Sequence, residues 1–317
     1  MKAAIDILFR SLGFTFSLFF VLHFVEFTLS GWVKHSDLDQ TGKINVIMNN
    51  KVDPEIMIFG MSTAEVGLSS RVISDSTGKS CYNAAIDGTP IPASKFVIDH
   101  FVRESKSCHT AVLALSYFSL AECDYLVEPS RFLAYYRDPD VKQTVRNVDP
   151  DLYRKWYYVP FYSFVTSKHT YYKNAAIGAR RKFRDLQLFP DENMGFVPHF
   201  DEYSDTRKDS LVHELGISPK SVRELGETME ELKSAGIKPV VVLCPMYRVG
   251  MNAYSNVNGY RNVLNELCAA HQVPLFVDYS DHQIVDDESL FYNNGHFNAK
   301  GAQRFSEMVA SELNTLW

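Results

Sequence analysis

A serine near the start of the chain and a histidine near its end have the settings that nucleophilic catalysis requires. Ser62 follows the apolar run 56–60, and His296 stands two residues before Asn298, a residue type that favours helix N-caps. A serine hydroxyl is a weak nucleophile until an imidazole takes its proton. Ser62 alone would be explained as a helix N-cap, but the histidine has no hydrophobic reason to lie in its loop. The pair therefore predicts a Ser-His site of the esterase or acyltransferase kind.

Both residues belong to a repeating pattern of strands and helices that begins near Pro54. Short apolar runs of the kind buried on both faces occur at 56–59, 82–86, 111–115, 240–243 and 275–277. Helical stretches lie between and after them. This alternation predicts an α/β fold, a three-layer α/β/α sandwich with a mainly parallel, flavodoxin-like sheet of five strands. Sites in such folds gather at the carboxyl ends of the strands, where Ser62 and His296 are expected.

The segment at about 124–216 interrupts this rhythm and is rich in aromatic and charged residues. We expect a largely helical insertion between the third and fourth strands. Most of its aromatic side chains are expected to pack the insertion itself, and a few could line a sugar-binding groove. The remainder of 36–317 is expected to form one domain around the sheet.

The first 35 residues predict a membrane anchor. Lys2 and Arg10 precede an apolar run that continues to Trp32, and about 20 apolar residues are enough to cross a bilayer. No small-x-small cleavage site follows, which favours a retained signal anchor over a cleaved signal peptide. The leading positive charge places the N-terminus in the cytoplasm and the domain outside. Glu26 would be costly in lipid, so it either faces a partner helix or, more simply, lies at the far headgroup boundary.

Composition excludes several other classes of function. The net charge of −6 argues against nucleic acid as a partner, because phosphate binding needs a basic face. The five cysteines show no metal-ligand spacing, so no metal or other cofactor is expected. Cys108 and Cys123 could pair in an oxidising compartment, a point that sequence leaves open.

Three short blocks resemble those of the SGNH/GDSL hydrolase superfamily. Gly60-Met61-Ser62 is similar to the first block, and the run 82–88 to the second. The run 293–302, with His296 followed by Phe297 and Asn298, is similar to the last block. Together with the anchor and the insertion, they resemble a membrane-anchored branch that includes the D-alanyl-teichoic-acid transfer protein and the alginate O-acetylation proteins. The resemblance covers about 54–317, apart from the insertion.

The resemblance also implies an oxyanion hole, with one departure. It assigns the N–H groups of Ser62 and Gly88 to the hole, where the family normally adds an Asn side chain from its third block. Here the corresponding strand end carries Ser116 and no Asn. The Ser116 hydroxyl or the Asn83 side chain is then expected to help. Losing one such donor typically costs about 10²–10³ in rate.

The second departure concerns the residue that orients the histidine. Where the resemblance implies an Asp three residues before His296, the chain has Asn293. An amide oxygen can hold the imidazole, but it supplies no negative charge, and the equivalent change in a serine protease costs about 10⁴ in kcat. Three readings remain open. Another carboxylate orients His296, the site is a slow Ser-His dyad, or catalysis has been lost. The candidate carboxylates are Asp278, Asp281 and Asp287.

By this resemblance, the protein is expected to be an extracytoplasmic, membrane-anchored serine acyltransferase or esterase. It would act on acyl groups, acetyl first among them, of a cell-surface polysaccharide. A membrane-bound O-acyltransferase is the implied source of acyl groups. The alternative is a catalytically degenerate protein of the same fold that binds glycan or a membrane partner in polysaccharide assembly or export.

Overall fold

Five parallel strands form the central sheet of the protein, whose structure is a computed structural model describing residues 2–204 and 212–317. The strands are β1 Ile56–Gly60, β2 Cys81–Asn83, β3 Thr110–Leu115, β4 Lys238–Leu243 and β5 Leu275–Asp278. Their order is β2-β1-β3-β4-β5, and every neighbouring pair is parallel. This is the flavodoxin-like order. The predicted fold class is therefore confirmed.

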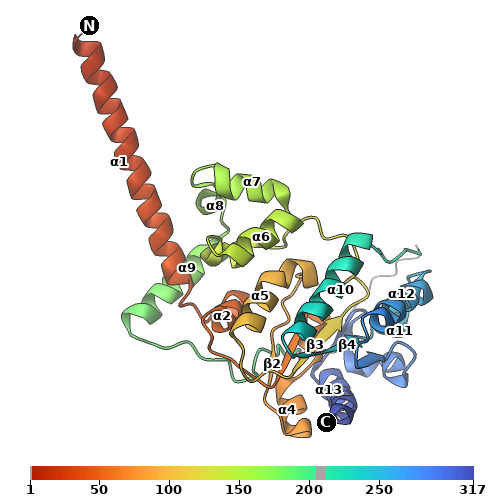
Figure 1. The fold of residues 1–317 in the computed structure, drawn as a ribbon. Coiled ribbons are helices and arrows are strands. Elements are labelled where there is room, and N and C mark those ends of the chain that lie inside the picture. Colours follow the sequence, from red (N-terminus) through yellow and green to blue (C-terminus); the bar gives the residue numbers. More distant parts are fainter. Residues whose placement is uncertain (1, 205–211) are drawn as a thin grey trace. The chain divides into compact units, whose positions relative to one another are not determined.

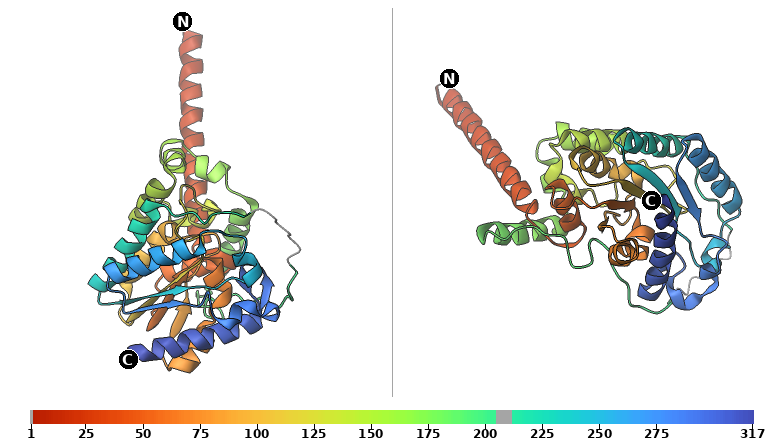
Figure 2. Two further views of the ribbon diagram at one scale, coloured as in Figure 1. Left: turned by 90° about the vertical axis from the view of Figure 1, so that its right-hand side faces the viewer. Right: turned by 60° about the horizontal axis from the view of Figure 1, so that its bottom comes forward.

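The strands are nearly continuous apolar runs because helices cover both faces of the sheet. Strands β1 and β3 are buried at every position. One helical layer contains α5 (Ile91–Glu104), α10 (Pro219–Ser234) and α12 (Val257–Ala270). The other contains α3 (Ser62–Gly67), α4 (Ser70–Thr77) and α13 (Ala299–Leu313). Figures 1 and 2 show α13 beside α4, across the sheet from α5 and α10. These layers are those that right-handed crossovers produce with this strand order.

Short elements complete the C-terminal part of the sheet region. These are α11 Arg248–Met251, η3 Gln283–Asp286, η4 Glu288–Leu290, β6 Phe291–Asn293, β7 His296–Phe297 and η5 Asn314–Leu316. Strands β6 and β7 pair antiparallel, so His296 lies on a small hairpin where the sequence pattern indicates only a loop. Asn298 caps α13 as expected, because its side chain accepts the N–H groups of Lys300 and Gly301.

The chain divides into two compact units. Unit 1 contains residues Met1–Asn45 and Glu128–Leu188, and unit 2 contains Val46–Val127 and Phe189–Trp317. Unit 2 carries the sheet. The helices of unit 1 are α1 Lys2–Val33, most of α2 (Asp39–Met48), η1 Pro129–Arg131, η2 Leu133–Tyr135, α6 Pro139–Val148, α7 Pro150–Tyr158, α8 Tyr162–Val165 and α9 His169–Phe183. The segment between β3 and β4 is thus helical in its first part, while residues 205–211 lie outside the described residues.

Helix α1 is long and apolar enough to cross a membrane. Its candidate span covers Ala3–Val33, and an 18-residue window within it has a mean hydropathy of 1.8 and is not buried by the rest of the protein. All five cysteines are free and buried, Cys108 and Cys123 among them.

Candidate active site

Ser62 and His296 lie in contact in unit 2. Ser62 is the first residue of α3, in the tight turn that follows β1, and His296 begins β7. The Ser62 Oγ lies 2.8 Å from the His296 Nε2, within the range of a good hydrogen bond. Residues 234 positions apart are brought together because the ends of the parallel strands and the turns that follow them share one edge of the sheet.

Asn293 holds the other nitrogen of this imidazole. Its Oδ1 lies 3.0 Å from the His296 Nδ1 and also accepts the N–H of Gly295 at 2.8 Å. A backbone N–H can only donate, so the Asn293 atom at this point must be the amide oxygen. The Nδ1 of His296 therefore carries the proton and donates it to Asn293. Nε2 is left as the acceptor, which is the tautomer needed to take a proton from Ser62.

Burial keeps the imidazole neutral. It lowers the pKa of His296 below its ordinary value, and the nearby His199 lowers it further, while the negative charge of Asp87 acts in the opposite direction. A neutral imidazole at pH 7 is the form that can act as a general base. Asp87 is exposed and directly precedes Gly88.

A short stack of rings packs against the imidazole. The Tyr292 ring lies 5.6 Å from the His296 ring at an angle of 20°, and the His199 ring lies 4.3 Å from Tyr292 at 14°. Sequence reasoning missed both residues. Tyr292 could have been suspected because it adjoins Asn293, but no pattern in the sequence connects His199 with this site.

The β6–β7 hairpin is held by the loop that follows β4 and by Tyr203. The carbonyl of Asn294, at the tip of the hairpin, accepts the N–H of Tyr247 at 3.1 Å, and its side-chain oxygen accepts the Tyr203 hydroxyl at 2.6 Å. Gly250 approaches so closely that an added Cβ would lie 2.7 Å from the Asn294 carbonyl oxygen. A side chain at position 250 would therefore push on the hairpin that carries Asn293 and His296.

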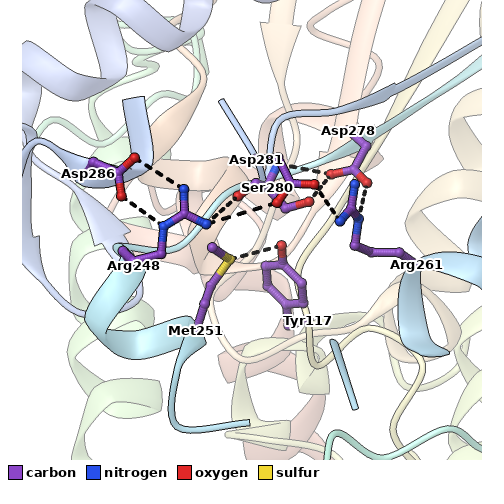
Figure 3. Close-up of polar contacts among 8 residues, drawn as sticks. All are labelled: Tyr117, Arg248, Met251, Arg261, Asp278, Ser280, Asp281 and Asp286. Atoms are coloured by element: carbon purple, nitrogen blue, oxygen red, sulfur yellow. Dashed lines mark hydrogen bonds and ion pairs between the residues drawn. The ribbon is translucent and has the colours of Figure 1, made fainter. Parts of the chain in front are cut away.

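The three carboxylates considered as alternative partners of His296 are engaged elsewhere. Asp278 and Asp281 both bind the guanidinium of Arg261, at 2.6 and 2.7 Å (Figure 3). Asp287 caps η4 by accepting the N–H and the hydroxyl of Ser289. In the described part of the chain, the hydrogen-bond partners of the His296 ring are Ser62 and Asn293.

Arg248, at the end of the β4 loop, is also paired. Its Nε and Nη2 bind the two oxygens of Asp286 at 2.8 and 3.1 Å, and its Nη1 donates to the carbonyl of Ser280 (Figure 3). This bidentate pair joins the β4 loop to η3, just before the hairpin. The arrangement is that of a structural ion pair between these two segments.

The residues considered for the oxyanion hole differ in their availability. The Asn83 side chain is fully buried, and its amide hydrogen-bonds to backbone groups. It donates to the carbonyls of Ala64 and Leu68 and accepts the N–H of Ala85. It braces α3 against β2. Ser116 accepts the N–H of Phe118 at 3.1 Å and is buried in the turn after β3.

Gly88 has a backbone conformation that favours glycine. Its φ is +65°, and an added Cβ would lie 3.0 Å from the Val127 Cγ1. In the described part of the chain, neither the Ser62 N–H nor the Gly88 N–H donates to another protein group. Both remain available to a ligand. The described residues contain no group of three His, Cys, Asp or Glu side chains that could hold a metal ion.

Comparison with known proteins adds little to this geometry. No family model and no curated protein matches the sequence. Among solved structures, the chain is similar to one described as "a putative platelet activating factor from Streptococcus pneumonia". The two share 10% sequence identity, the match covers 86% of this chain and 90% of that one, and the TM-score is 0.45. A likeness at this level assigns neither a family nor an activity to this chain.

Proposed function

We propose that this protein is a membrane-anchored serine acyltransferase or esterase in which Ser62 is the nucleophile. The observation that carries the proposal is the relay from Ser62 through His296 to Asn293, with distances of 2.8 and 3.0 Å. The tautomer that Gly295 imposes through Asn293 leaves Nε2 ready to accept the hydroxyl proton. Nucleophile, base and orienting group are the three parts that such catalysis needs.

In the proposed reaction, Ser62 Oγ attacks the carbonyl carbon of an ester as its proton passes to His296 Nε2. The carbonyl oxygen becomes an oxyanion, which the N–H groups of Ser62 and Gly88 stabilise. The ester C–O bond then breaks, the leaving oxygen takes the proton from Nε2, and an acyl-serine remains. A sugar hydroxyl or water then attacks this acyl group in the same way and restores Ser62. Attack by the sugar hydroxyl makes the protein a transferase, and attack by water makes it an esterase.

Asn293 sets the expected speed of this reaction. Its amide oxygen orients the imidazole but adds no charge to stabilise the imidazolium that forms during each step. Turnover is expected to be slow compared with that of an enzyme with an aspartate here. An activated acyl donor suits such a site, because a good leaving group needs less help from the acid.

The proposed substrate class follows from the sequence resemblance and the anchor. We infer that the acyl group, acetyl first among the candidates, is transferred to or removed from a cell-surface polysaccharide outside the cytoplasmic membrane. Helix α1 would hold the domain at the membrane, and a membrane-bound O-acyltransferase would supply acyl groups. Lys2 and Arg10, which are positively charged and lie at the start of α1, support a cytoplasmic N-terminus.

The test is covalent labelling of the full-length protein with a fluorophosphonate probe. We expect labelling of the wild type, and loss of labelling in both Ser62→Ala and His296→Ala. Ser311→Ala is the matched control, since it removes an exposed serine hydroxyl near the C-terminal end of α13 that makes no contact with Ser62 or His296. A folded wild type that stays unlabelled would contradict the proposal.

A second candidate function is supported by the same departures. Asn293 stands where the resembled family has a carboxylate, and the turn after β3 carries Ser116 instead of an Asn. Both changes remove catalytic groups while leaving the fold intact. A protein that binds glycan at this edge without reacting would show saturable polysaccharide binding, and its probe labelling would be absent.

A further inference from the structure

The exposed length of helix α1 matches the thickness of a bilayer. Residues 3–21 are all exposed, whereas Glu26, Ser30 and Val33 are buried within unit 1. At 1.5 Å per residue, about 20 residues span the roughly 30 Å hydrocarbon core. The core is counted from Leu8, which is close enough to Arg10 for that side chain to reach the headgroups. It then ends near Phe27, so it extends past the exposed residues into the part of α1 that unit 1 partly covers.

The turn between α7 and α8, taken as residues 157–165, packs against the part of α1 that lies within this hydrocarbon core. The Phe161 ring lies 5.4 Å from the Phe19 ring and 4.9 Å from the His23 ring. Phe19 is eight residues before Phe27, so this contact lies roughly 6–12 Å toward the N-terminus from the expected boundary. Figure 1 shows α7 and α8 nearer the N-terminal end of α1 than α6. The turn therefore reaches the depth at which interfacial helices lie, about 5–10 Å into the headgroup and acyl boundary.

The same turn shields the acidic residue of α1. Glu26 is 5% exposed, accepts the Ser163 hydroxyl at 2.9 Å and lies 3.5 Å from the His23 Nδ1. A carboxylate facing lipid would be costly, but one covered by protein and hydrogen-bonded is tolerated. The α7–α8 turn thus makes it possible for this part of α1 to lie at the membrane boundary.

The outer surface of the turn is apolar and aromatic. Tyr158 is 72% exposed, Val165 is 70% exposed and Val159 is 48% exposed. Cationic side chains lie over neighbouring rings, with Lys155 5.9 Å from the Tyr162 ring. Arg137, on the preceding loop, lies 5.9 Å from the Phe27 ring of α1. Aromatic rings with adjacent Lys and Arg are typical of protein surfaces at the membrane interface.

The charge of unit 1 has the sign that phospholipid phosphates attract. This unit contains 16 Lys and Arg residues and 10 Asp and Glu residues, a formal net charge of +6. The whole chain has −6, so unit 2 carries the remaining −12. Only unit 1 is therefore attracted to an anionic membrane surface, at distances within about 8–10 Å of it.

We propose that the α7–α8 turn, residues 157–165, inserts into the outer boundary of the bilayer and seats unit 1 on the membrane surface. The inference rests on the proposed membrane-spanning role of α1. Tyr158, Val159 and Val165 enter the acyl boundary, while Arg137 and Lys155 meet lipid phosphates. The occupant of this exposed apolar surface is the phospholipid bilayer itself, because the surface continues directly from the exposed length of α1.

The test measures how close labels on the full-length protein come to lipid. Single cysteines replace Tyr158 or Val165, and Gln143→Cys on α6 is the control, an exposed polar position in the same unit. The five native cysteines are buried, so a polar maleimide fluorophore selects the introduced thiol. The protein is reconstituted in vesicles of phosphatidylethanolamine and phosphatidylglycerol that contain lipids with a nitroxide near the headgroup end of the acyl chain.

We expect the labels at positions 158 and 165 to be quenched several-fold more than the label at 143. Equal quenching at all three positions overturns the inference. A fourth label, Phe14→Cys, with a nitroxide placed at the bilayer centre, tests the span separately. Quenching there without quenching at 158 and 165 rejects only the seated turn. If the label at position 14 is not quenched, the membrane span is rejected and, with it, this inference.

Discussion

At the scale of single residues, Ser62, His296 and Asn293 form a hydrogen-bonded relay whose third member is neutral. The geometry around His296 depends on one amide oxygen that accepts two donors, Gly295 N–H and His296 Nδ1–H. An aspartate in the same place could accept both donors and would add a charge. In the proposed reaction, position 293 is therefore where the rate can be adjusted without disturbing the fold.

We predict that Asn293→Asp raises the rate of acyl-enzyme formation at least tenfold, while Asn293→Ala lowers it. The introduced carboxylate would stabilise the imidazolium that forms as Ser62 attacks, and the amide-for-carboxylate difference is about 10⁴ in a serine protease. Labelling kinetics with a fluorophosphonate, compared among the three proteins, measure the effect. A rate that is unchanged in both variants would show that position 293 does not act on His296.

The pH dependence should reveal the surroundings of the same imidazole. Burial lowers the pKa of His296, so the neutral base persists below pH 6.5. The midpoint of the acid limb, in kcat/KM or in the labelling rate, should therefore lie below about pH 6.5. The charge of Asp87 raises this pKa, so Asp87→Asn should move the acid limb to still lower pH. A profile that does not move, or moves upward, would exclude electrostatic contact between Asp87 and His296.

At the scale of elements, the site is assembled by the packing of loops against the hairpin β6–β7. We predict that Gly250→Ala lowers the labelling rate of Ser62 at least tenfold, because the added Cβ would meet the Asn294 carbonyl oxygen at 2.7 Å and displace the hairpin. Gly259→Ala is the matched control. An added Cβ at Gly259 would have no neighbour within 4 Å, and alanine in helix α12 should stabilise the protein by up to about 1 kcal/mol.

Thermal unfolding of both glycine variants separates a shifted hairpin from a damaged fold. A folded Gly250→Ala protein with wild-type labelling would contradict the role given to this contact. Equal loss of labelling in both variants would do so too, because nothing near Gly259 touches the hairpin.

The elements also show what a single sequence can and cannot reveal. The sheet was predictable because each strand is a short apolar run, and the positions of Ser62 and His296 followed from the rule that sites gather at strand ends. The hairpin that carries His296 was not predictable, since β6 and β7 are only three and two residues long. The ring stack of His199 on Tyr292 was not predictable either, because it joins residues 93 positions apart without any periodic pattern.

At the scale of the whole molecule, the last turns of α1 belong to the core of unit 1. Ser30 of α1 hydrogen-bonds with Tyr171 at 3.1 Å, and Ser36, three residues after the end of α1, donates to Asn174 at 2.6 Å. Tyr171 and Asn174 both belong to α9. Gly178 allows α9 to approach the Trp32 carbonyl so closely that an added Cβ would lie 1.8 Å from its oxygen. Cleavage of α1 as a signal peptide would remove Ser30 and Trp32 and so strip α9 of these two contacts.

We therefore predict that the mature protein keeps α1 and behaves as an integral membrane protein. Its intact mass in the native membrane should include the N-terminal 30 residues, and alkaline carbonate or high salt should leave it in the membrane pellet, because the exposed length of α1 is long enough to cross the bilayer. Electrostatic attraction alone would be released by salt. A mature chain that begins after α1, or that is released by carbonate, would show that the buried turns of α1 are dispensable to unit 1. Gly178→Leu provides an independent check. It should destabilise unit 1 and lower the yield of folded protein in detergent, since the larger side chain has no room against Trp32.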